Sequence, residues 1–374
     1  MLLNRLVQLA ARHGASDLHL AAGRPALLRV RGELRSLGGS AGGPVTAADT
    51  EAAARALLPG DDWPRFLAQG SADLSRDLEG VRCRINLLRS AGHVGLAVRL
   101  LPAGAVSLES LNLHPELATL VEPEHGLVLV SGPTGCGKSS TLAALVQHVN
   151  RSRAAHIVTI EQPVEFALQP ARSFIRQREV GRDTPSFEQG LLDALREDID
   201  VLMVGEMRER ETMRLTLDAC ETGHLVLATL HSSTVIEALQ RVVSAFPAQE
   251  QPSVCAQLAD NLIAVVSQRL VWRDDPGLRV PECEILVANT AVQSIVRQGQ
   301  LFKLNTAMET GGRSRMWTLP RYRQWIESKS DWVLPGARNA RGVPVARGGG
   351  DEVIEIQPED ASLSDIVSEL EKEG

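Results

Sequence analysis

A glycine-rich octapeptide, residues 132–139, has the spacing of a phosphate-binding loop. Its sequence, GPTGCGKS, fits the pattern G-x-x-x-x-G-K-[S/T] at every specified position. Glycines let the backbone turn tightly and bring successive N–H groups toward phosphate oxygens. Lys138 should reach the β- and γ-phosphates, Ser139 has a hydroxyl suited to Mg²⁺, and Ser140 can bond a neighbouring phosphate. We therefore expect ATP and Mg²⁺ to be bound by Gly132, Pro133, Thr134, Gly135, Cys136, Gly137, Lys138, Ser139 and Ser140.

The elements on either side of this loop are those that such a loop needs. Residues 127–130 form a short apolar run that is typical of a buried parallel strand. After the loop, apolar residues recur at i, i+3, i+4 and i+7, which predicts a helix with one buried stripe from Leu142 to Val149. The positive end of that helix would add to the attraction for phosphate. An accidental glycine-rich turn would not need these flanks, so we favour the phosphate-binding interpretation.

Acidic side chains follow two further apolar strands. Glu161 and Glu165 come after the run 156–160, and Glu206 comes after the run 200–204. The carboxyl ends of parallel strands form the rim of the sheet where ligands bind. Glu161 or Glu165 could orient water or hold Mg²⁺, although a plain strand-end turn is the alternative. Glu206 could polarise an attacking water or reach the metal through water.

Two histidines and a group of arginines are further candidates. His224 and His231 bracket the apolar strand 225–230. Isolated histidines are most often structural, but His231 at a strand end could sense the γ-phosphate through a donor N–H. Four arginines are dense in residues 82–99, where they form either the solvated face of an antiparallel sheet or, in part, arginine fingers for a γ-phosphate. They are Arg82, Arg84, Arg89 and Arg99.

Composition excludes several other classes of protein. The five cysteines form no C-x-x-C pair, so neither a zinc knuckle nor a disulfide framework is indicated. The net charge is -7, but residues 351–374 hold nine acidic side chains and one lysine, which leaves the rest near neutral. That distribution leaves no excess of positive charge of the kind that binds nucleic acid. No apolar run is long enough to cross a bilayer, and Arg5 and Arg12 interrupt the apolar start, which argues against a signal peptide. We expect a cytoplasmic protein.

Pattern changes along the chain predict two folded domains. Alternating strands and an amphipathic first helix predict a small α/β domain, and from Leu113 strands alternate with helices as in a parallel sheet. Gly and Arg are frequent in residues 336–350. In the acidic residues 351–374, apolar residues from Leu363 to Leu370 recur at helical spacing. The expected parts are an α/β domain at 1–100, a linker at 101–112, an ATPase domain with C-terminal helices at 113–335, a Gly/Arg-rich linker at 336–350, and an acidic tail with a possible short helix at 351–374.

Several longer motifs resemble one family. The segments ASDLHLAAGRP, DVLMVGEMRERET, ETGHLVLATLHSSTVIEALQRVVSAFP and VSQRL are similar to the type II/IV secretion ATPase superfamily, and within it to the PilT/PilU-like ATPases of type IV pilus retraction (twitching motility). The resemblance covers about residues 1 to 325. It implies a RecA-like P-loop NTPase core with a smaller N-terminal PAS-like domain, assembled as a homohexamer in which ATP hydrolysis drives domain rotation. It also implies a motor that acts on an inner-membrane pilus platform protein and is peripheral to the membrane, not embedded.

The same resemblance implies roles for individual residues. It assigns phosphate and Mg²⁺ to Lys138 and Ser139, the aspartate box to Glu161 and Glu165, the Walker B segment to Glu206, the histidine box to His224 and His231, and charge supplied to the nucleotide to Arg84 and Arg99. The Mg²⁺ ligands would be Ser139 and Glu206, and Glu206 would bind the ion either directly or through a water molecule.

Two departures from the family pattern keep alternative functions open. Gln162 stands where the family usually has aspartate, and residues 291–298 read AVQSIVRQ where the family reads close to AIRNLIRE. An accessory or regulatory PilU-like partner of another pilus motor ATPase is therefore one alternative. A pilus assembly or type II secretion ATPase is another, although those typically carry a four-cysteine zinc insert and this chain has only Cys255 and Cys283 in that region.

Overall fold

The computed structural model describes residues 2–30, 32–37, 44–101 and 106–334. The linker expected at 336–350 and the acidic tail expected at 351–374 therefore lie outside the described residues. Contacts within the chain divide the described residues into two units, with the division between residues 103 and 104. Each unit is described by itself.

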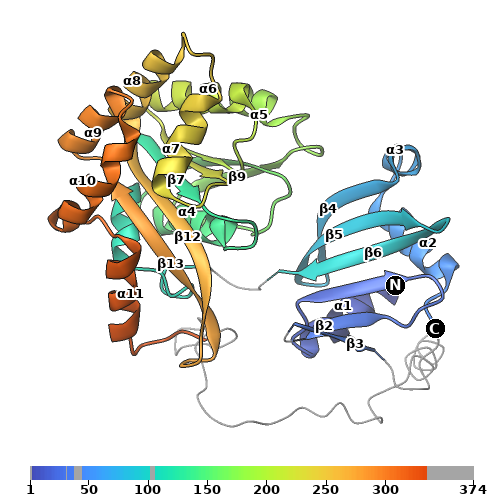
Figure 1. The fold of residues 1–374 in the computed structure, drawn as a ribbon. Helices are drawn as coiled ribbons and strands as arrows, with labels where there is room; N and C mark the ends of the chain where they lie inside the picture. The colour runs from blue at the N-terminus through green and yellow to red at the C-terminus, as the bar shows by residue number, and fades with distance from the viewer. Residues whose placement is uncertain (1, 31, 38–43, 102–105, 335–374) are drawn as a thin grey trace. The chain divides into compact units, whose positions relative to one another are not determined.

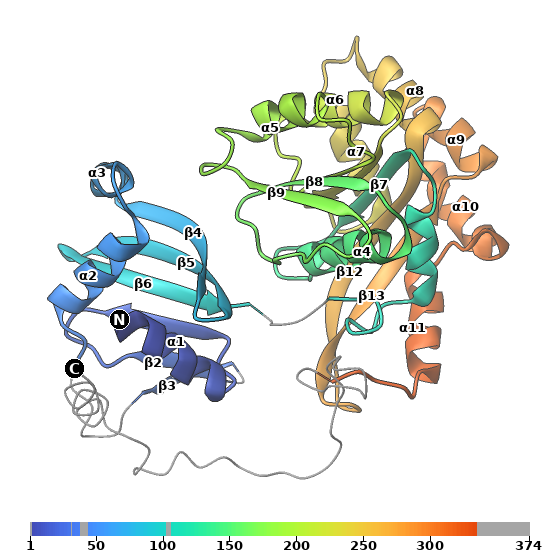
Figure 2. The same ribbon diagram turned by 180° about the vertical axis from the view of Figure 1, so that it is seen from behind.

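The first unit is an antiparallel sheet with helices on one face. Its strands lie in the order β3-β2-β1-β6-β5-β4. Figure 2 shows α1 and α2 in front of this sheet. The elements are α1 (Leu2–Arg12), β1 (Asp17–Ala21), β2 (Leu27–Val30), β3 (Glu33–Ser36), α2 (Ala47–Leu57), α3 (Asp62–Gln69), β4 (Ser71–Leu78), β5 (Val81–Ser90) and β6 (His93–Leu100).

Side-chain periodicity explains this packing. Helix α1 buries one stripe of apolar residues that includes Leu6 and Val7. The strands alternate, so that Cys83 and Ile85 of β5 face the helices and are fully buried. Helix α2 begins where Thr46 caps it, since the Thr46 side chain accepts a hydrogen bond from the Asp49 N–H. The amphipathic first helix and an α/β domain with alternating strands were predicted from sequence, but α3 and β4 were not among the predicted elements.

The second unit is a mostly parallel sheet with helices on both faces. Its strand order is β13-β12-β7-β11-β10-β8-β9, and only β13 runs antiparallel to its neighbour. The strands are β7 (Gly126–Ser131), β8 (His156–Glu161), β9 (Phe174–Glu179), β10 (Val201–Val204), β11 (Leu225–Leu230), β12 (Leu262–Arg273) and β13 (Leu278–Val287). The α-helices are α4 (Lys138–Ser152), α5 (Phe187–Ala194), α6 (Arg210–Glu221), α7 (Val235–Ser244), α8 (Gln251–Asn261), α9 (Thr290–Arg297), α10 (Leu304–Thr310) and α11 (Leu319–Ser328).

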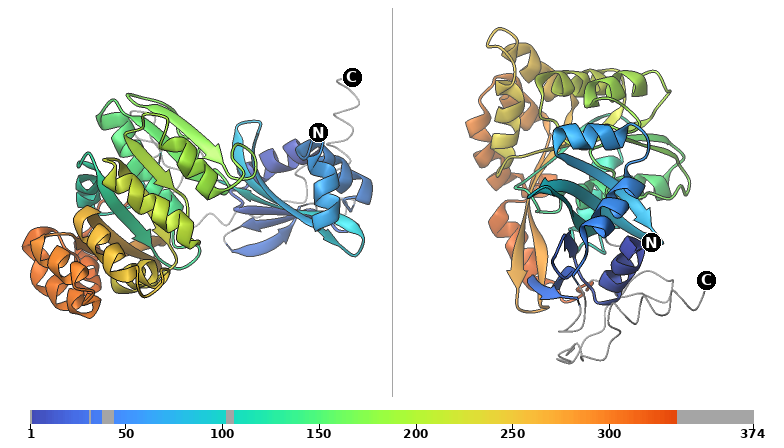
Figure 3. Two further views of the ribbon diagram at one scale, coloured as in Figure 1. Left: turned by 90° about the horizontal axis from the view of Figure 1, so that it is seen from above. Right: turned by 90° about the vertical axis from the view of Figure 1, so that its right-hand side faces the viewer.

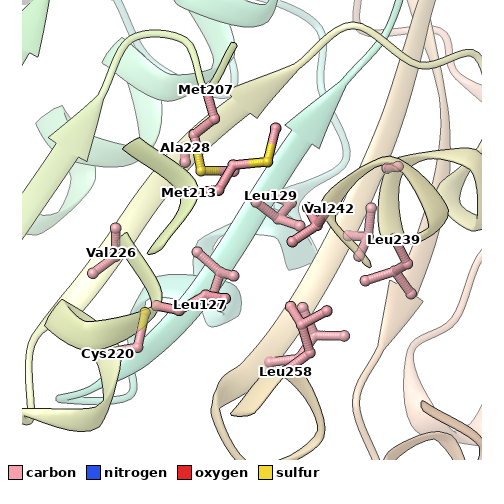
Figure 4. Packing of buried hydrophobic residues seen from close by; sticks show 14 of the residues in the cluster. Leu127, Leu129, Met207, Met213, Cys220, Val226, Ala228, Leu239, Val242 and Leu258 are labelled. Atoms are coloured by element: carbon pink, nitrogen blue, oxygen red, sulfur yellow. The ribbon is translucent and has the colours of Figure 1, made fainter. Parts of the chain in front are cut away.

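Successive residues of the central strands face different helices. Leu127 and Leu129 of β7 belong to one buried cluster with residues of α5 to α10, and the close view in Figure 4 shows the part of this cluster at α7 and α8. Val128 and Val130 face α4 and α11 on the other side. Both layers are visible in Figure 1 and, from above, in Figure 3. Strands buried on both faces read as continuous apolar runs, which is why the sequence revealed them.

The α/β fold with two sheets, expected from sequence, is confirmed. The edge strand β9 and the long β12–β13 hairpin were not predicted. Among the described residues, no helix has the length and apolar character needed to cross a membrane.

Candidate nucleotide site

The phosphate loop joins β7 to α4, and its backbone requires glycine. Gly132 has φ of 147°, and a Cβ there would collide with the carbonyl oxygen of Gln268. Gly137 has φ of 90° and is the residue from which α4 begins at Lys138. Both conformations are left-handed, a region that disfavours residues with a Cβ. The loop therefore ends where the first turn of α4, the positive end of that helix, begins.

Lys138 lies folded into this loop. Its Nζ donates hydrogen bonds to the carbonyl oxygens of Gly132 (2.8 Å) and Pro133 (3.1 Å), and the residue is 9% exposed. Burial lowers the pKa of Lys138, while the negative charges of Glu206 and Glu165 act in the opposite direction. The charge of Lys138 is thus placed where a phosphate chain would follow the loop.

A chain of contacts links Lys138 to the end of β10. His231 follows β11, and its Nδ1 lies 3.4 Å from Lys138 Nζ. On the other side of the ring, His231 Nε2 lies 3.0 Å from Glu206 Oε1. A neutral imidazole with its proton on Nε2 satisfies both contacts, because Nδ1 can then accept from the ammonium group. The structure thus brings together three residues that the sequence analysis selected separately.

Arg208 also binds Glu206. Its Nε lies 2.7 Å from Oε1 and its Nη2 lies 2.7 Å from Oε2, a bidentate pair. Burial by itself raises the pKa of Glu206, but the hydrogen bonds from Arg208 and His231 and the positive charge of Arg208 outweigh it, so the pKa lies below its ordinary value. Glu206 is therefore held as a carboxylate.

Glu161 at the end of β8 has a different environment. Its carboxyl group is buried and accepts hydrogen bonds from Thr159 Oγ1 (2.7 Å) and Gln177 Nε2 (3.1 Å). Burial raises the pKa of Glu161 to about 7 despite these bonds, and the charge of Glu165 adds to the rise. Glu161 can therefore hold or release a proton near neutral pH.

One residue that holds the loop was given no role from sequence. Gln268 of β12 is 4% exposed; its Nε2 donates to the Cys136 carbonyl oxygen (2.6 Å), and its Oε1 accepts from Thr141 Oγ1 (2.7 Å). One side chain thus fixes both the loop and the first turn of α4. The run VSQRL contains Gln268, but only the fold shows what it touches.

A cavity of about 200 Å³ lies on the other side of the loop from Glu206 and His231. In the sheet order, β12 and β13 flank β7 on one side, whereas β11, β10 and β8 follow on the other. The cavity is on the β12–β13 side, and its lining combines apolar side chains with polar ones. It is lined by residues 110–113, Gly137, Ser140, Thr141, Gln268, Leu270, Leu278, Arg279, Pro281 and Val333.

Three other candidates are not brought to the loop within this unit. His224 precedes β11, and its carbonyl oxygen accepts a hydrogen bond from the N–H of Gly126 at the start of β7. It therefore lies at the opposite end of a strand about 20 Å long from His231. Arg84 and Arg99 are cross-strand partners in the first unit, where they pair with Asp73 (2.7 Å) and Asp17 (3.0 Å). Their role as arginine fingers stays a prediction.

Known proteins match both the sequence and the fold. The family model described as "Type II/IV secretion system protein" matches residues 1–310. The uncharacterised protein YggR of Escherichia coli is 41% identical over 319 residues, which cover 85% of this chain and 96% of YggR. The type IV pilus retraction ATPase PilT of Pseudomonas aeruginosa is 36% identical over 343 residues, which cover 91% of this chain and 98% of PilT.

A solved structure agrees with these matches. The crystal structure of the pilus retraction motor PilT with bound ADP superposes with a TM-score of 0.80 at 36% identity and covers 87% of this chain and 92% of that one. The family resemblance read from the sequence motifs is therefore confirmed. The chain belongs to the type II/IV secretion system protein family, as an ATPase related to the pilus motor PilT.

Proposed function

We propose that this chain is the ATP-driven motor of a retracting type IV pilus. Its triphosphate would lie along the loop at residues 132–139, with the nucleoside in the cavity beside β12 and β13 and the γ-phosphate toward Glu206 and His231. The observation that carries the catalytic part of the proposal is the contact chain from Lys138 through His231 to Glu206, whereas the pilus role rests on the similarity to PilT. This contact chain joins the phosphate loop to a carboxylate that can act on water.

The geometry supports a division of roles in hydrolysis. Lys138 neutralises charge that develops on the phosphate chain. A carboxylate has about four acceptor sites; Arg208 and His231 fill two on Oε1 of Glu206, and Arg208 fills one on Oε2. One site on Oε2 thus stays open to accept a hydrogen bond from the attacking water. The proton on His231 Nε2 keeps Glu206 oriented.

Mg²⁺ is expected with the triphosphate. Across the ranges that the structure describes, no cluster of three or more His, Cys, Asp or Glu side chains could hold a metal. That fits a Mg²⁺ held through one hydroxyl, phosphate oxygens and waters, because this ion seldom occupies an all-protein cage. Ser139, in the first turn of α4, would supply the hydroxyl, and Glu206 would contact the ion through water. Bound Mg²⁺ would offset negative charge on the phosphates.

The assembly in which the motor works is also proposed. We expect a homohexamer with a RecA-like core and a PAS-like first unit, acting in the cytoplasm on an inner-membrane platform protein. ATP hydrolysis in one subunit would then rotate the first unit of a neighbouring subunit. Arg84 and Arg99 are the candidate arginine fingers, which would neutralise the γ-phosphate.

The first test is ATP turnover by the purified chain. Lys138→Ala and Glu206→Gln should each lower kcat by at least about 10²-fold. Arg210→Ala, which changes an exposed residue close to Glu206 in sequence, is the matched control. A wild-type rate no higher than that of Lys138→Ala would indicate a regulatory partner without turnover of its own.

The second test is a count of surface pili after deletion of the gene in its host, with complementation by Glu206→Gln. Excess pili without twitching would support retraction. Loss of pili would indicate an assembly motor, and an unchanged count with weaker retraction force would indicate an accessory motor.

A further inference from the structure

The end of the described chain forms part of the cavity beside the phosphate loop. Val333 lines this cavity together with residues 110–113, although more than two hundred positions separate them in sequence. Ser140 and Gly137 line the same cavity from the loop side. The cavity wall is therefore made by two distant segments that have to be held together.

Asn112 holds them. Its Nδ2 donates to the Val333 carbonyl oxygen (2.7 Å), and its Oδ1 accepts from the Val333 N–H (2.9 Å). The two bonds run in opposite directions between one amide group and one residue, so they fix both position and orientation. Asn112 is 5% exposed and has φ of 55°, a left-handed conformation that asparagine tolerates better than most residues.

The segment that leads to Val333 has its own anchors. Lys329 lies over the rings of Trp325 and Trp332, with its Nζ 5.8 Å and 5.6 Å from their centroids. One helical turn before Trp325, the hydroxyl of Tyr322 accepts a hydrogen bond from the N–H of His114 (3.1 Å). Residues 329–334 thus run from α11 back to the segment that begins the second unit.

We infer that Asn112 is a positioning residue for the nucleoside of ATP, because its two hydrogen bonds hold Val333 in the wall of the proposed nucleoside cavity. This inference rests on the proposed function. Leu111, Leu113 and Val333 offer an apolar surface of the kind that covers a nucleobase, whereas the groups that neutralise phosphate lie at Lys138. Loss of the two Asn112–Val333 hydrogen bonds should therefore weaken binding of the nucleoside and leave binding of the phosphates unchanged.

The test compares Asn112→Gly with wild type and with Asn289→Gly. Glycine tolerates the left-handed backbone at position 112 and removes the whole side chain, including the amide that bonds Val333. Asn289 is the matched control, because its side-chain oxygen also accepts a backbone hydrogen bond, from the N–H of Val292. It follows β13 at the end of the sheet that lies away from the phosphate loop. KM for ATP, kcat and the inhibition constant of inorganic tripolyphosphate, which has no nucleoside, are measured for each protein.

We expect KM for ATP to rise roughly five- to tenfold in Asn112→Gly, as for two lost hydrogen bonds, with kcat and the tripolyphosphate constant within about twofold of wild type. Asn289→Gly should match wild type in all three. An unchanged KM for ATP, or tripolyphosphate binding weakened by the same factor as ATP, would overturn the role of Asn112. A wild-type chain that neither turns over ATP nor binds a fluorescent ATP analogue would instead overturn the proposed function itself.

Discussion

His231 and Glu206 lie at the carboxyl ends of neighbouring parallel strands, with His231 Nε2 3.0 Å from Glu206 Oε1. Strands β10 and β11 pair in register, so the residues that follow them emerge side by side. The contact is therefore a direct result of sheet geometry. It places a histidine between the lysine of the phosphate loop and the glutamate that can act on water.

The two histidines that flank β11 should differ sharply in importance. His231→Ala removes the contacts to Lys138 and Glu206, so we expect kcat to fall by about 10²-fold. His224→Ala removes only contacts to the last turn of α6 and the residue after it, so kcat should stay within about twofold. Steady-state ATP turnover measures both. Equal losses in the two variants would contradict the placement of His224 away from the site.

Arg208 should control the pH at which the enzyme becomes active. The hydrogen bond and charge of Arg208 help to keep the pKa of Glu206 below its ordinary value, against the effect of burial. In Arg208→Ala the pKa of Glu206 should rise, because burial is then less opposed. The acid limb of the pH profile of kcat/KM should therefore move to higher pH.

Two further variants make this test specific to Arg208. Arg208→Lys keeps a positive charge without the bidentate geometry and should give an intermediate profile. Arg210→Ala should leave the acid limb in place. An Arg208→Ala enzyme that is slower at every pH by one factor would show that Arg208 acts without tuning Glu206.

Gln268 should contribute to nucleotide affinity through the loop that it holds. Gln268→Ala leaves the Cys136 carbonyl and the Thr141 hydroxyl without this partner in a buried site, which costs about 1–3 kcal/mol. We expect a lower melting temperature and at least roughly tenfold weaker ATP binding, measured with a fluorescent analogue. Thr141→Val removes one of the two bonds and should have the smaller effect on affinity. Full ATP affinity in Gln268→Ala would show that the loop keeps its shape without this side chain.

Local patterns were sufficient to predict the phosphate loop and the strand-end acids. The loop spacing, the helical stripe from Leu142 to Val149 and the apolar runs before Glu161 and Glu206 are all readable within about twenty residues. Parallel pairing brings the strand ends to one edge of the sheet, which is why Glu206 and His231 lie together in the structure. The direction of β11 also separates His231 from His224, a consequence that the sequence analysis did not draw.

Contacts between distant segments could not be predicted in this way. The bond from Gln268 to Cys136 spans 132 positions, and that from Asn112 to Val333 spans 221. Neither residue type signals its partner, because an amide can bond almost any backbone group. Gly205 is similar, since a Cβ there would come within 3.2 Å of the Ile160 carbonyl oxygen on β8, a closeness set only by the packed sheet.

Glu161 should reduce the stability of the folded chain above neutral pH. Its folded-state pKa is raised from the ordinary 4.5 to about 7, so between those values the folded chain keeps a proton that the unfolded chain releases. Stability from this group is therefore full below pH 4.5 and is lost as pH rises to 7, by an amount on the order of 3 kcal/mol. Glu161→Gln cannot ionise and can still accept the hydrogen bond from Thr159.

We expect Glu161→Gln to melt at a higher temperature than wild type at pH 8, to match it near pH 4.5, and to hydrolyse ATP more slowly. The difference between the two proteins isolates Glu161, because the other titrating groups are common to both. Glu122→Gln, a change at an exposed carboxyl group of the same unit, is the control for loss of one negative charge. Higher stability with lower activity would show a carboxyl group kept for chemistry at a cost to folding. A variant that melts below wild type at pH 8 would show instead that the ionised carboxylate of Glu161 stabilises the fold.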